Sequence, residues 1–242
     1  MSKQPSYWLY GKHPVEAAMQ NGKRQITKLI ITKNNVNFLT KYSTLLHRRD
    51  IPTQILETVD FDKMLGHNVK SHQGIALATR TLNQPNLFDL PLTKINTLVM
   101  LDQITDPQNI GAIMRTATAF GVAAVIAAKD CTPGENAAMV KTSAGAFEKT
   151  PYIQVTNLSQ TIKKLQEHDF WILALDKNGQ NNISSINNFE KKLLIFGSED
   201  KGIRNINLQA SDISLKINMT HHVESLNVAS AAAICLHITF NQ

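Results

Sequence analysis

The chain has 242 residues, of which 43% are hydrophobic, enough for one large or two small globular domains. No apolar run approaches the roughly 18 to 20 residues that span a bilayer, and the first residues lead into no apolar signal-like core, so we expect a cytoplasmic protein. The two cysteines, Cys131 and Cys235, belong to no CxxC pair or Cys/His cluster. This predicts thiols in a reducing compartment and no metal site.

The net charge of +6 is unevenly distributed along the chain. Residues 1–80 hold 12 Lys and Arg against 5 Asp and Glu, whereas residues 81–242 hold 13 against 14. A basic first third suits a polyanionic partner, but a solvated surface would give the same balance. The charge alone does not separate these two interpretations.

The first third, residues 1–80, has the pattern of a small α/β unit. The expected elements in chain order are a helix through 15–19 with Pro14 at its first position, a strand at 28–32, a helix at 36–49, a strand at 52–56, a short helix capped by Asp60 and ending at Leu65, and a strand at 75–78. Basic side chains stand mostly at the ends of these elements, which suits phosphate contacts better than a buried site.

Residues 81–95 contain two prolines and little periodicity, which predicts a linker. From residue 96 onward, strands and helices alternate. The expected strands are 97–101, 122–127, 152–155, 171–175, 192–196 and 213–217, and the expected helices are 109–120, 135–147, 158–167 and a last helix capped by Ser225. Continuous apolar strands between helices predict an α/β fold with a mainly parallel sheet covered on both faces.

Three polar loops, at 106–115, 197–203 and 225–228, each follow a strand-like run or lead into the last helix, and α/β proteins bind ligands in such loops. Each loop also has an ordinary structural interpretation. Asn109 could cap a helix while Arg115 is solvated, the glycines could form a tight turn, and Ser225 could be a cap alone. No single loop is decisive.

Common cofactor motifs are missing from the sequence. It contains neither GxGxxG after the first strand nor GxxxxGK[ST], so a standard dinucleotide site and a P-loop are both unsupported. The adjacent pair His221 and His222 indicates a polar turn, because neighbouring side chains in a loop rarely converge on one ion.

The order of the three loops resembles the SPOUT superfamily of RNA methyltransferases, and within it the TrmH-type 2′-O-ribose methyltransferases. The matching stretches are DPQNIG at 106–111 with Arg115, GSE at 197–199 with Gly202, and Ile217 with SLNV at 225–228. The stretches YGKHPVEA at 10–17 and HQGIA at 72–76 are similar to the opening and closing of the ribosomal-protein-like domain in RlmB-type enzymes. The resemblance covers nearly the whole chain.

This resemblance implies a deep trefoil knot, a homodimer and S-adenosyl-L-methionine as cofactor. The implied cofactor contacts, largely through backbone groups, are Gly197, Ile217 and Leu226. The implied catalytic residues are Arg115, Asn109, Glu199, Ser225 and Asn227. From the placement of the basic side chains, and not from the resemblance, we expect RNA contacts at Lys12, Lys23, Arg24, Lys28, Arg48 and Arg49.

The pKa of a guanidinium, above about 12, makes Arg115 a poor base at neutral pH. We expect it instead to stabilise negative charge developing on the ribose 2′-oxygen and to hold the adjacent phosphate. Asn109 would orient the ribose, and Glu199 would hold Arg115 or a neighbouring donor. Ser225 and Asn227 would fix the geometry.

The expected domains are an RNA substrate-binding domain at 1–80, a linker at 81–95 and a SPOUT methyltransferase domain at 96–242. The expected function is methylation of the ribose 2′-oxygen of a guanosine in large-subunit (23S) ribosomal RNA. Two alternatives stay open: a tRNA ribose methyltransferase, and an RNA-binding ribosome-assembly factor without catalysis. Asp200 in place of the family's second glycine and Asn218 in place of its proline favour the last alternative.

Overall fold

The computed structural model describes residues 6–66, 69, 71–220 and 222–240. Its contacts divide the chain into two compact units, the first made of residues 1–83 and 135–148, the second of residues 84–134 and 149–242. The domain boundaries expected from the sequence include residues 135–148 in the second domain, whereas the contacts of this segment group it with the first unit. Within the described ranges, no helix has the length and apolar character that crossing a lipid bilayer requires.

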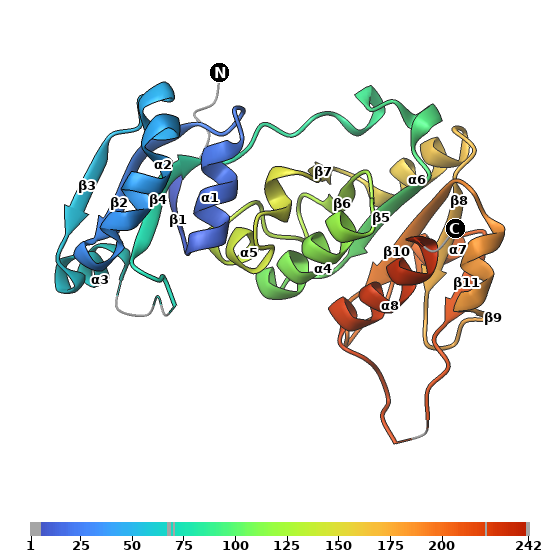
Figure 1. Cartoon of the computed structure of the whole chain (residues 1–242). Helices are drawn as coiled ribbons and strands as arrows, with labels where there is room; N and C mark the ends of the chain where they lie inside the picture. Colours follow the sequence, from blue (N-terminus) through green and yellow to red (C-terminus); the bar gives the residue numbers. More distant parts are fainter. Residues whose placement is uncertain (1–5, 67–68, 70, 221, 241–242) are drawn as a thin grey trace. The chain divides into compact units, whose positions relative to one another are not determined.

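The first unit is built on a sheet with the order β1-β4-β2-β3 (Figure 1). Strand β4 is antiparallel to β1 and β2, and β2 is parallel to β3. Its elements are β1 Ser6–Tyr10, α1 Lys12–Gln20, β2 Ile26–Thr32, η1 Lys33–Asn35, α2 Val36–Arg48, β3 Thr53–Leu56, α3 Thr58–Leu65, β4 Ile75–Arg80, α5 Ala137–Thr142 and η4 Ala146–Glu148.

The stretches 10–17 and 72–76, on which the resemblance of the first unit rests, lie next to each other in the structure. The backbone N–H of Gly11 donates to the carbonyl of Ile75, and the N–H of Lys12 donates to Oε1 of Gln73 at 2.8 Å. Gly74 has a φ of +65°, and a Cβ there would lie 2.3 Å from Oγ1 of Thr32, so only glycine fits. The opening and closing stretches therefore form one joined corner of the unit.

Two expectations for the first unit are wrong in detail. Asp60 lies inside the first turn of α3, which begins at Thr58, so it is not the cap. Pro14 is the third residue of α1 rather than the first. Strand β1 was not expected at all, because its five residues follow directly on the N-terminal segment and precede a turn.

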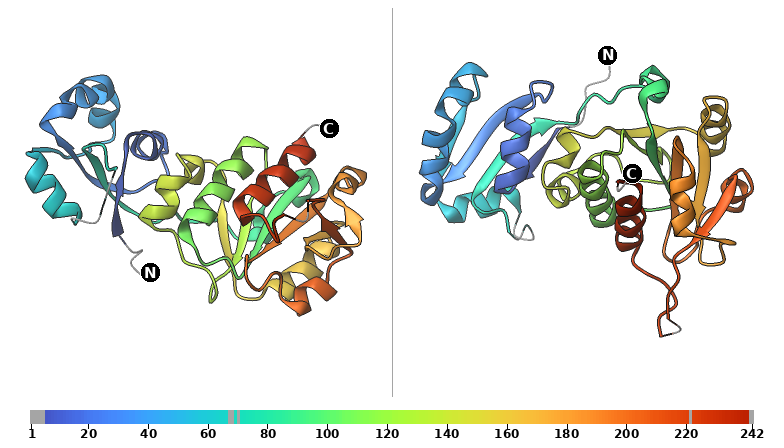
Figure 2. Two further views of the ribbon diagram at one scale, coloured as in Figure 1. Left: turned by 90° about the horizontal axis from the view of Figure 1, so that it is seen from below. Right: turned by 45° about the vertical axis from the view of Figure 1, so that its right-hand side comes forward.

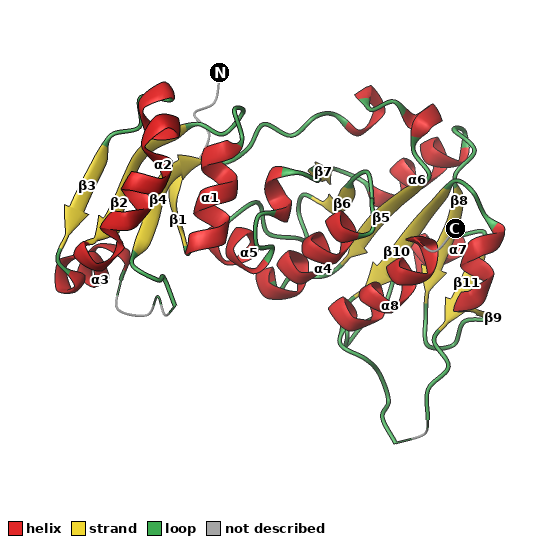
Figure 3. Ribbon diagram, viewed as in Figure 1, coloured by secondary structure: helices red, strands yellow, loops and turns green. Residues whose placement is uncertain are grey.

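The second unit is built on a sheet with the order β7-β6-β5-β10-β8-β11-β9, in which every described strand pair is parallel (Figure 3). The predicted mainly parallel α/β sheet is thus confirmed. Its elements are η2 Leu87–Asp89, η3 Leu92–Lys94, β5 Thr97–Asp102, α4 Pro107–Ala119, β6 Val125–Ala128, β7 Tyr152–Val155, α6 Leu158–Gln166, β8 Trp171–Leu175, β9 Asn181–Asn182, η5 Ile183–Asn188, β10 Lys192–Gly197, α7 Asn205–Gln209, β11 Ile213–Lys216 and α8 Val228–Phe240.

Helices cover both faces of this second sheet. Leu158, Ile162 and Leu165 of α6 pack into a buried cluster with alternate residues of β5, β6, β8 and β10. Helices α4 and α8 lie side by side on the opposite face (Figure 2). All strands point the same way, so the loops after β5, β10 and β11 share one edge of the sheet.

Two expected helix caps of the second unit are also wrong. The N-cap of α4 is Asp106, whose carboxylate accepts from the backbone N–H groups of Gln108 and Asn109 at 3.0 and 3.3 Å. Helix α8 starts at Val228, and Oδ1 of Asn227 accepts from the N–H of Ala229 at 3.0 Å. Capping by Asp106 and Asn227 leaves Asn109 and Ser225 without that structural role.

Candidate active site

Asn109 is positioned by the start of α4. Pro107 occupies the first helical position with its φ already suited to a helix, and Asp106 ties down the free amides of the first turn. The side chain of Asn109 therefore projects from a rigid helix start at the carboxyl end of β5. It is half-buried, and its amide reaches the loop that follows β10.

Glu199 is carried by a tight loop after β10. Ser198 and Gly202 pair through two backbone hydrogen bonds of 3.2 and 2.9 Å, which closes the loop. A Cβ on Gly197 would lie 2.1 Å from the carbonyl carbon of Gly202, so no larger residue fits at the base. Glycine at 197 is thus required by the fold itself, whatever else it contacts.

The Glu199 carboxylate joins two distant parts of the chain. Its Oε1 accepts from Nδ2 of Asn227 at 2.6 Å, from Nδ2 of Asn109 at 3.5 Å, and from the backbone N–H of Val228 at 3.3 Å. Asn227 also donates to Oδ1 of Asn109 at 2.9 Å. The start of α8 adds a favourable positive end of a helix dipole beside the carboxylate. We call Asn109, Glu199 and Asn227 the polar triad.

The polar triad is open to solvent on one side. Glu199 and Asn227 are exposed, and Oε2 of Glu199 makes no hydrogen bond to any residue of the described ranges. A hydroxyl group of a ligand could therefore donate to Oε2 while Oε1 stays held. This arrangement can orient a polyhydroxylated ligand, such as a ribose, against fixed amides.

Two of the five expected catalytic residues do not join the triad within one chain. Arg115 lies six residues beyond Asn109, about 9 Å along α4 and about 120° around it. Its side chain is exposed, and no hydrogen bond or ion pair to another described residue is found. Ser225 is likewise exposed and has no hydrogen-bond partner among the described residues.

The expected cofactor contacts lie around the same edge of the sheet. Gly197 ends β10, Ile217 follows β11, and Leu226 precedes Asn227; all three are half-buried. Among the described residues, the backbone N–H and C=O groups of Ile217 and Leu226 have no backbone hydrogen-bond partner. These groups remain able to bond a ligand, which fits a cofactor held by backbone groups.

Asp102, at the carboxyl end of β5, is a residue that sequence reasoning missed. It is fully buried, and its carboxylate accepts from the backbone N–H and Nε of Arg204 at 2.9 and 2.7 Å and from Nδ2 of Asn207 at 2.7 Å. These bonds anchor the end of the Glu199 loop to the sheet. The signal available in the sequence was a single carboxylate directly after the apolar strand-like run 97–101.

The expected RNA contacts differ in what they can reach. Lys12, Lys23 and Arg48 are exposed, and Lys28 is half-buried. Arg24 is enclosed, 1% exposed, and pairs with Glu135 and Glu148. The expectation that Arg24 contacts RNA is therefore wrong.

Arg49 is also engaged by the protein. Its Nη1 donates to the carbonyls of Met19 and Asn21 at 2.7 and 2.9 Å, and its Nη2 donates to the carbonyl of Arg24 at 2.5 Å. Burial lowers the pKa of Arg49, and the neighbouring charge of Arg48 adds to this effect. Its guanidinium holds the end of α1 and the turn after it, which leaves little of it for a phosphate.

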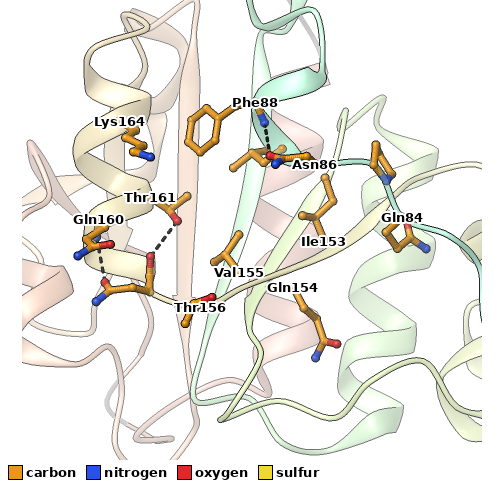
Figure 4. A pocket seen from close by; sticks show the side chains of 13 residues that line it. Gln84, Asn86, Phe88, Ile153, Gln154, Val155, Thr156, Gln160, Thr161 and Lys164 are labelled. Carbon is orange, nitrogen blue, oxygen red and sulfur yellow. Dashed lines mark hydrogen bonds between the residues drawn. The ribbon is translucent and has the colours of Figure 1, made fainter. Parts of the chain in front are cut away.

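A groove of ≈ 480 Å³ lies elsewhere in the second unit, between the 84–88 segment, β7 and the start of α6 (Figure 4). Its lining is rich in amides, and the ammonium of Lys164 stands 5.3 Å from the ring centre of Phe88. No member of the polar triad lines it. Among the described residues no group of three His, Cys, Asp or Glu could hold a metal ion, and His221 lies outside them.

Comparison with known proteins agrees with the loops that build the triad. The pattern of the SpoU rRNA methylase family matches residues 96–237, and that of the RNA 2′-O ribose methyltransferase substrate-binding domain matches residues 8–85. The chain belongs to the SpoU rRNA methylase family. All three members of the polar triad lie in the part that matches the methylase pattern.

Relatives and solved structures span the chain. The 23S rRNA (guanosine-2′-O-)-methyltransferase RlmB of Neisseria meningitidis is 33% identical over 97% of this chain and 94% of its own. The protein of the same name from Nitrosomonas europaea is 32% identical over 98% and 92%. The SpoU methyltransferase AviRb of Streptomyces viridochromogenes, solved with AdoMet, matches 98% of this chain and 90% of its own, with a TM-score of 0.81 at 22% identity, a likeness in fold.

Proposed function

We propose that this SpoU-family protein uses S-adenosyl-L-methionine to methylate the ribose 2′-oxygen of a guanosine in 23S ribosomal RNA. The observation that carries the proposal is the polar triad. Its residues, Asn109, Glu199 and Asn227, come from three separate segments of the chain and are hydrogen bonded to one another at the carboxyl edge of a parallel sheet. The RlmB relatives, similar along their whole length, support the substrate. We propose that the enzyme acts in the cytoplasm, where it would meet such a substrate.

The chemistry assigns a part to each residue of the triad. When bound, S-adenosyl-L-methionine supplies the methyl group of its sulfonium. The ribose 2′-oxygen takes this methyl group and loses the proton of its hydroxyl. Asn109 and Asn227, fixed by Glu199, hold the ribose in line, and Oε2 of Glu199 accepts from a ribose hydroxyl. Gly197, Ile217 and Leu226 present backbone groups to the cofactor. Ser225, next to Leu226, adds a hydroxyl at the same loop.

The direct test supplies the full-length protein with methyl-labelled cofactor and, separately, 23S rRNA and tRNA. We expect label in 23S rRNA and a guanosine whose 3′ phosphodiester resists alkali, because a 2′-O-methyl group removes the attacking hydroxyl. Label in tRNA alone would support the tRNA alternative. Label in neither RNA would support a non-catalytic assembly factor.

We propose that the active unit is a homodimer in which Arg115 acts on the site of the partner subunit. The support is that Arg115 is exposed, lacks a partner among the described residues of its own chain, and points about 120° away from Asn109 on α4. There it would stabilise negative charge on the 2′-oxygen.

Mixing two inactive variants tests this arrangement. Arg115→Ala and Asn109→Ala should each lose more than about 100-fold in methyl transfer while Arg115→Ala keeps cofactor binding. Refolded together, they should recover up to about a quarter of wild-type activity, because half of the dimers are mixed and carry one intact site. No recovery from a mixture shown to form hybrid dimers would place Arg115 in its own subunit's site.

We also propose the trefoil knot of this fold. The support is the chain path: β11 lies beside β8 and β9 toward one end of the sheet, whereas the next helix, α8, packs against α4 and β10. Stretching the unfolded chain from its two ends measures this directly. A knot shortens the final extension below the length of roughly 3.4 Å per residue expected for a free chain.

We propose that residues 1–80 bind the RNA, with 81–95 as linker and 96–242 as the methyltransferase domain. The exposed positions of Lys12, Lys23 and Arg48, and the half-buried position of Lys28, support this division. Phosphate contacts weaken with salt, so removing residues 1–80 should weaken RNA binding most at low salt. An unchanged salt dependence would exclude the basic domain from binding.

A further inference from the structure

One face of the first unit's sheet is only half covered. Helix α3 packs Phe61 and Met64 onto Ile30 and Ala76, which lie near the end of β2 and the start of β4. The same face continues toward the other end of the strands, where its side chains keep solvent exposure. The residues there, which we call the aromatic-basic patch, are Trp8, Lys28, Gln54, Ala78 and Arg80.

The strand register orders the aromatic-basic patch. Ala78 pairs with Trp8 on one side and with Lys28 on the other, so the three side chains form a row across β1, β4 and β2. Adjacent Cβ atoms in such a row stand about 5 Å apart. Alanine, which has the smallest side chain of the row, separates the indole from the lysine. Arg80 stands two residues further along β4, on the same face.

The two cations of the patch are held but not neutralised. Nζ of Lys28 donates to Oε1 of Gln54 at 2.5 Å, and Nη1 of Arg80 donates to Oε1 of Gln25 at 3.3 Å. Neither has an ion pair with a carboxylate of the described residues, and the patch itself contains no acidic residue. The patch therefore offers two positioned, uncompensated positive charges.

Other cations of the first unit contrast with these two. Lys33 pairs with Glu57, and Lys41 pairs with Glu16 at 3.3 Å. Their charges are already compensated by neighbours on the protein. Lys33 and Lys41 serve as matched comparisons, because they lie in the same unit and have the same charge.

Trp8 gives the patch a flat apolar surface. Its ring rests in part on the cluster formed by Ile30, Phe61 and Ala76, and the residue remains partly exposed. A base stacked on an indole is stabilised whatever its identity, by about 1 to 3 kcal/mol. A base lying over Ala78 would place its flanking phosphates toward Lys28 and Arg80.

We propose that the aromatic-basic patch binds an unpaired segment of RNA, with one base stacked on Trp8 and the neighbouring phosphates on Lys28 and Arg80. An RNA duplex fits less well, because its bases are already stacked on one another and would leave the indole without a partner. The inference rests on the proposed function only in that the substrate is RNA.

The first experiment follows the fluorescence of Trp8. The chain has two tryptophans, so the full-length Trp171→Phe variant makes Trp8 the sole indole. Titration with a single-stranded RNA of ten nucleotides should quench this fluorescence, whereas a duplex of the same length should quench it much less. Equal quenching by both, or none by the single strand, would overturn the proposal.

The second experiment measures affinity and its salt dependence. Trp8→Leu keeps the packing on Phe61 and should weaken single-strand binding about 5- to 100-fold. Lys28→Gln with Arg80→Gln should weaken binding and reduce the slope of log affinity against log salt by about 1.4. Lys33→Gln with Lys41→Gln should change both much less. Thermal unfolding shows whether each variant is folded, and wild-type affinity in both patch variants would disprove the patch.

The outcomes separate this proposal from the proposed function. If the protein methylates 23S rRNA and the patch variants bind RNA as well as the wild type does, the proposed function stands and the proposed RNA-binding patch is disproved. If the protein binds single-stranded RNA through Trp8 but methylates no RNA, the patch proposal stands and the proposed enzymatic function is disproved.

Discussion

The two units each hold a polar network, and the networks differ in their access to solvent. In the first unit the side chain of Arg24 is 0% exposed, and those of Glu135 and Glu148 are 6% and 3% exposed. In the second unit Glu199 and Asn227 are exposed. Both networks are well hydrogen bonded, so bonding alone does not mark a site. An oxygen left open to solvent, Oε2 of Glu199, is what distinguishes the triad.

The enclosed network keeps its charges because each is matched. Burial by itself would lower the pKa of Arg24, but the hydrogen bond and charge of Glu148 raise it above the ordinary value. Burial and the charge of Glu135 raise the pKa of Tyr7, which therefore stays protonated and donates to Glu135 at 2.6 Å. This network ties residues 135–148 to the first unit.

The largest expected effect is on stability, at Arg24. Arg24→Met should lower the free energy of unfolding by about 3 to 5 kcal/mol, because two buried carboxylates lose their partner. Denaturant unfolding measures this, and Arg48→Met, an exposed arginine of the same unit, is the control at within about 0.5 kcal/mol. Equal unfolding midpoints for the two variants would mean that the enclosed network contributes nothing to the stability of the fold.

The open network should respond in activity instead. Glu199→Gln keeps the shape but replaces an acceptor of three N–H groups, and we expect methyl transfer to fall about 100-fold, close to 2.7 kcal/mol. The unfolding midpoint should hardly move, because Glu199 is exposed. Lys201→Gln in the same loop serves as control. A large loss of stability with normal activity would reverse the assignment of the two networks.

Asp102 lies between the two extremes, since it is buried but supports the loop of the open network. Asp102→Asn replaces one carboxylate oxygen with an NH2 donor, so at least one of the two Arg204 hydrogen bonds loses its acceptor, which should cost about 1 to 3 kcal/mol of stability. Cofactor affinity should fall as well, because the Glu199 loop loses its anchor. Calorimetric titration with the cofactor measures the second effect, and an unchanged affinity would confine Asp102 to stability.

The smallest effect is chemical and concerns the two thiols. Burial raises the pKa of Cys235 to about 12, so almost no thiolate exists at pH 8, whereas Cys131 is exposed. Iodoacetamide at pH 8 should therefore modify one thiol of the folded protein, and Cys131→Ser should abolish that reaction. In denaturant both thiols of the wild type should react. Rapid modification of two thiols in the folded protein would contradict the burial.

Much of the second unit could be predicted from sequence because its strands are continuous apolar runs. The segments 171–175 and 158–167 match β8 and α6 closely. The dipeptide β9 and the five-residue α7 were missed, since neither is long enough to show a period. The predicted helix 135–147 is broken after α5, where Ala144 and Gly145 adopt positive φ.

The site could be predicted in its loops but not in all its contacts. The contact of Asn109 with Glu199 and Asn227 joins positions 90 and 118 residues away, and only the family resemblance indicated it. Arg24 shows the opposite outcome. Nothing near it in sequence reveals the two glutamates, 111 and 124 residues away, that enclose it.

The 84–88 segment has a protective consequence for the second unit. Strand β7 ends its sheet, and Oε1 of Gln84 accepts from the outward N–H of Tyr152 at 3.2 Å. An uncovered strand edge invites pairing with another chain, so this segment guards the sheet against aggregation. A shortened protein that begins at residue 96 would bare that edge, while one that begins before Gln84 would keep it shielded.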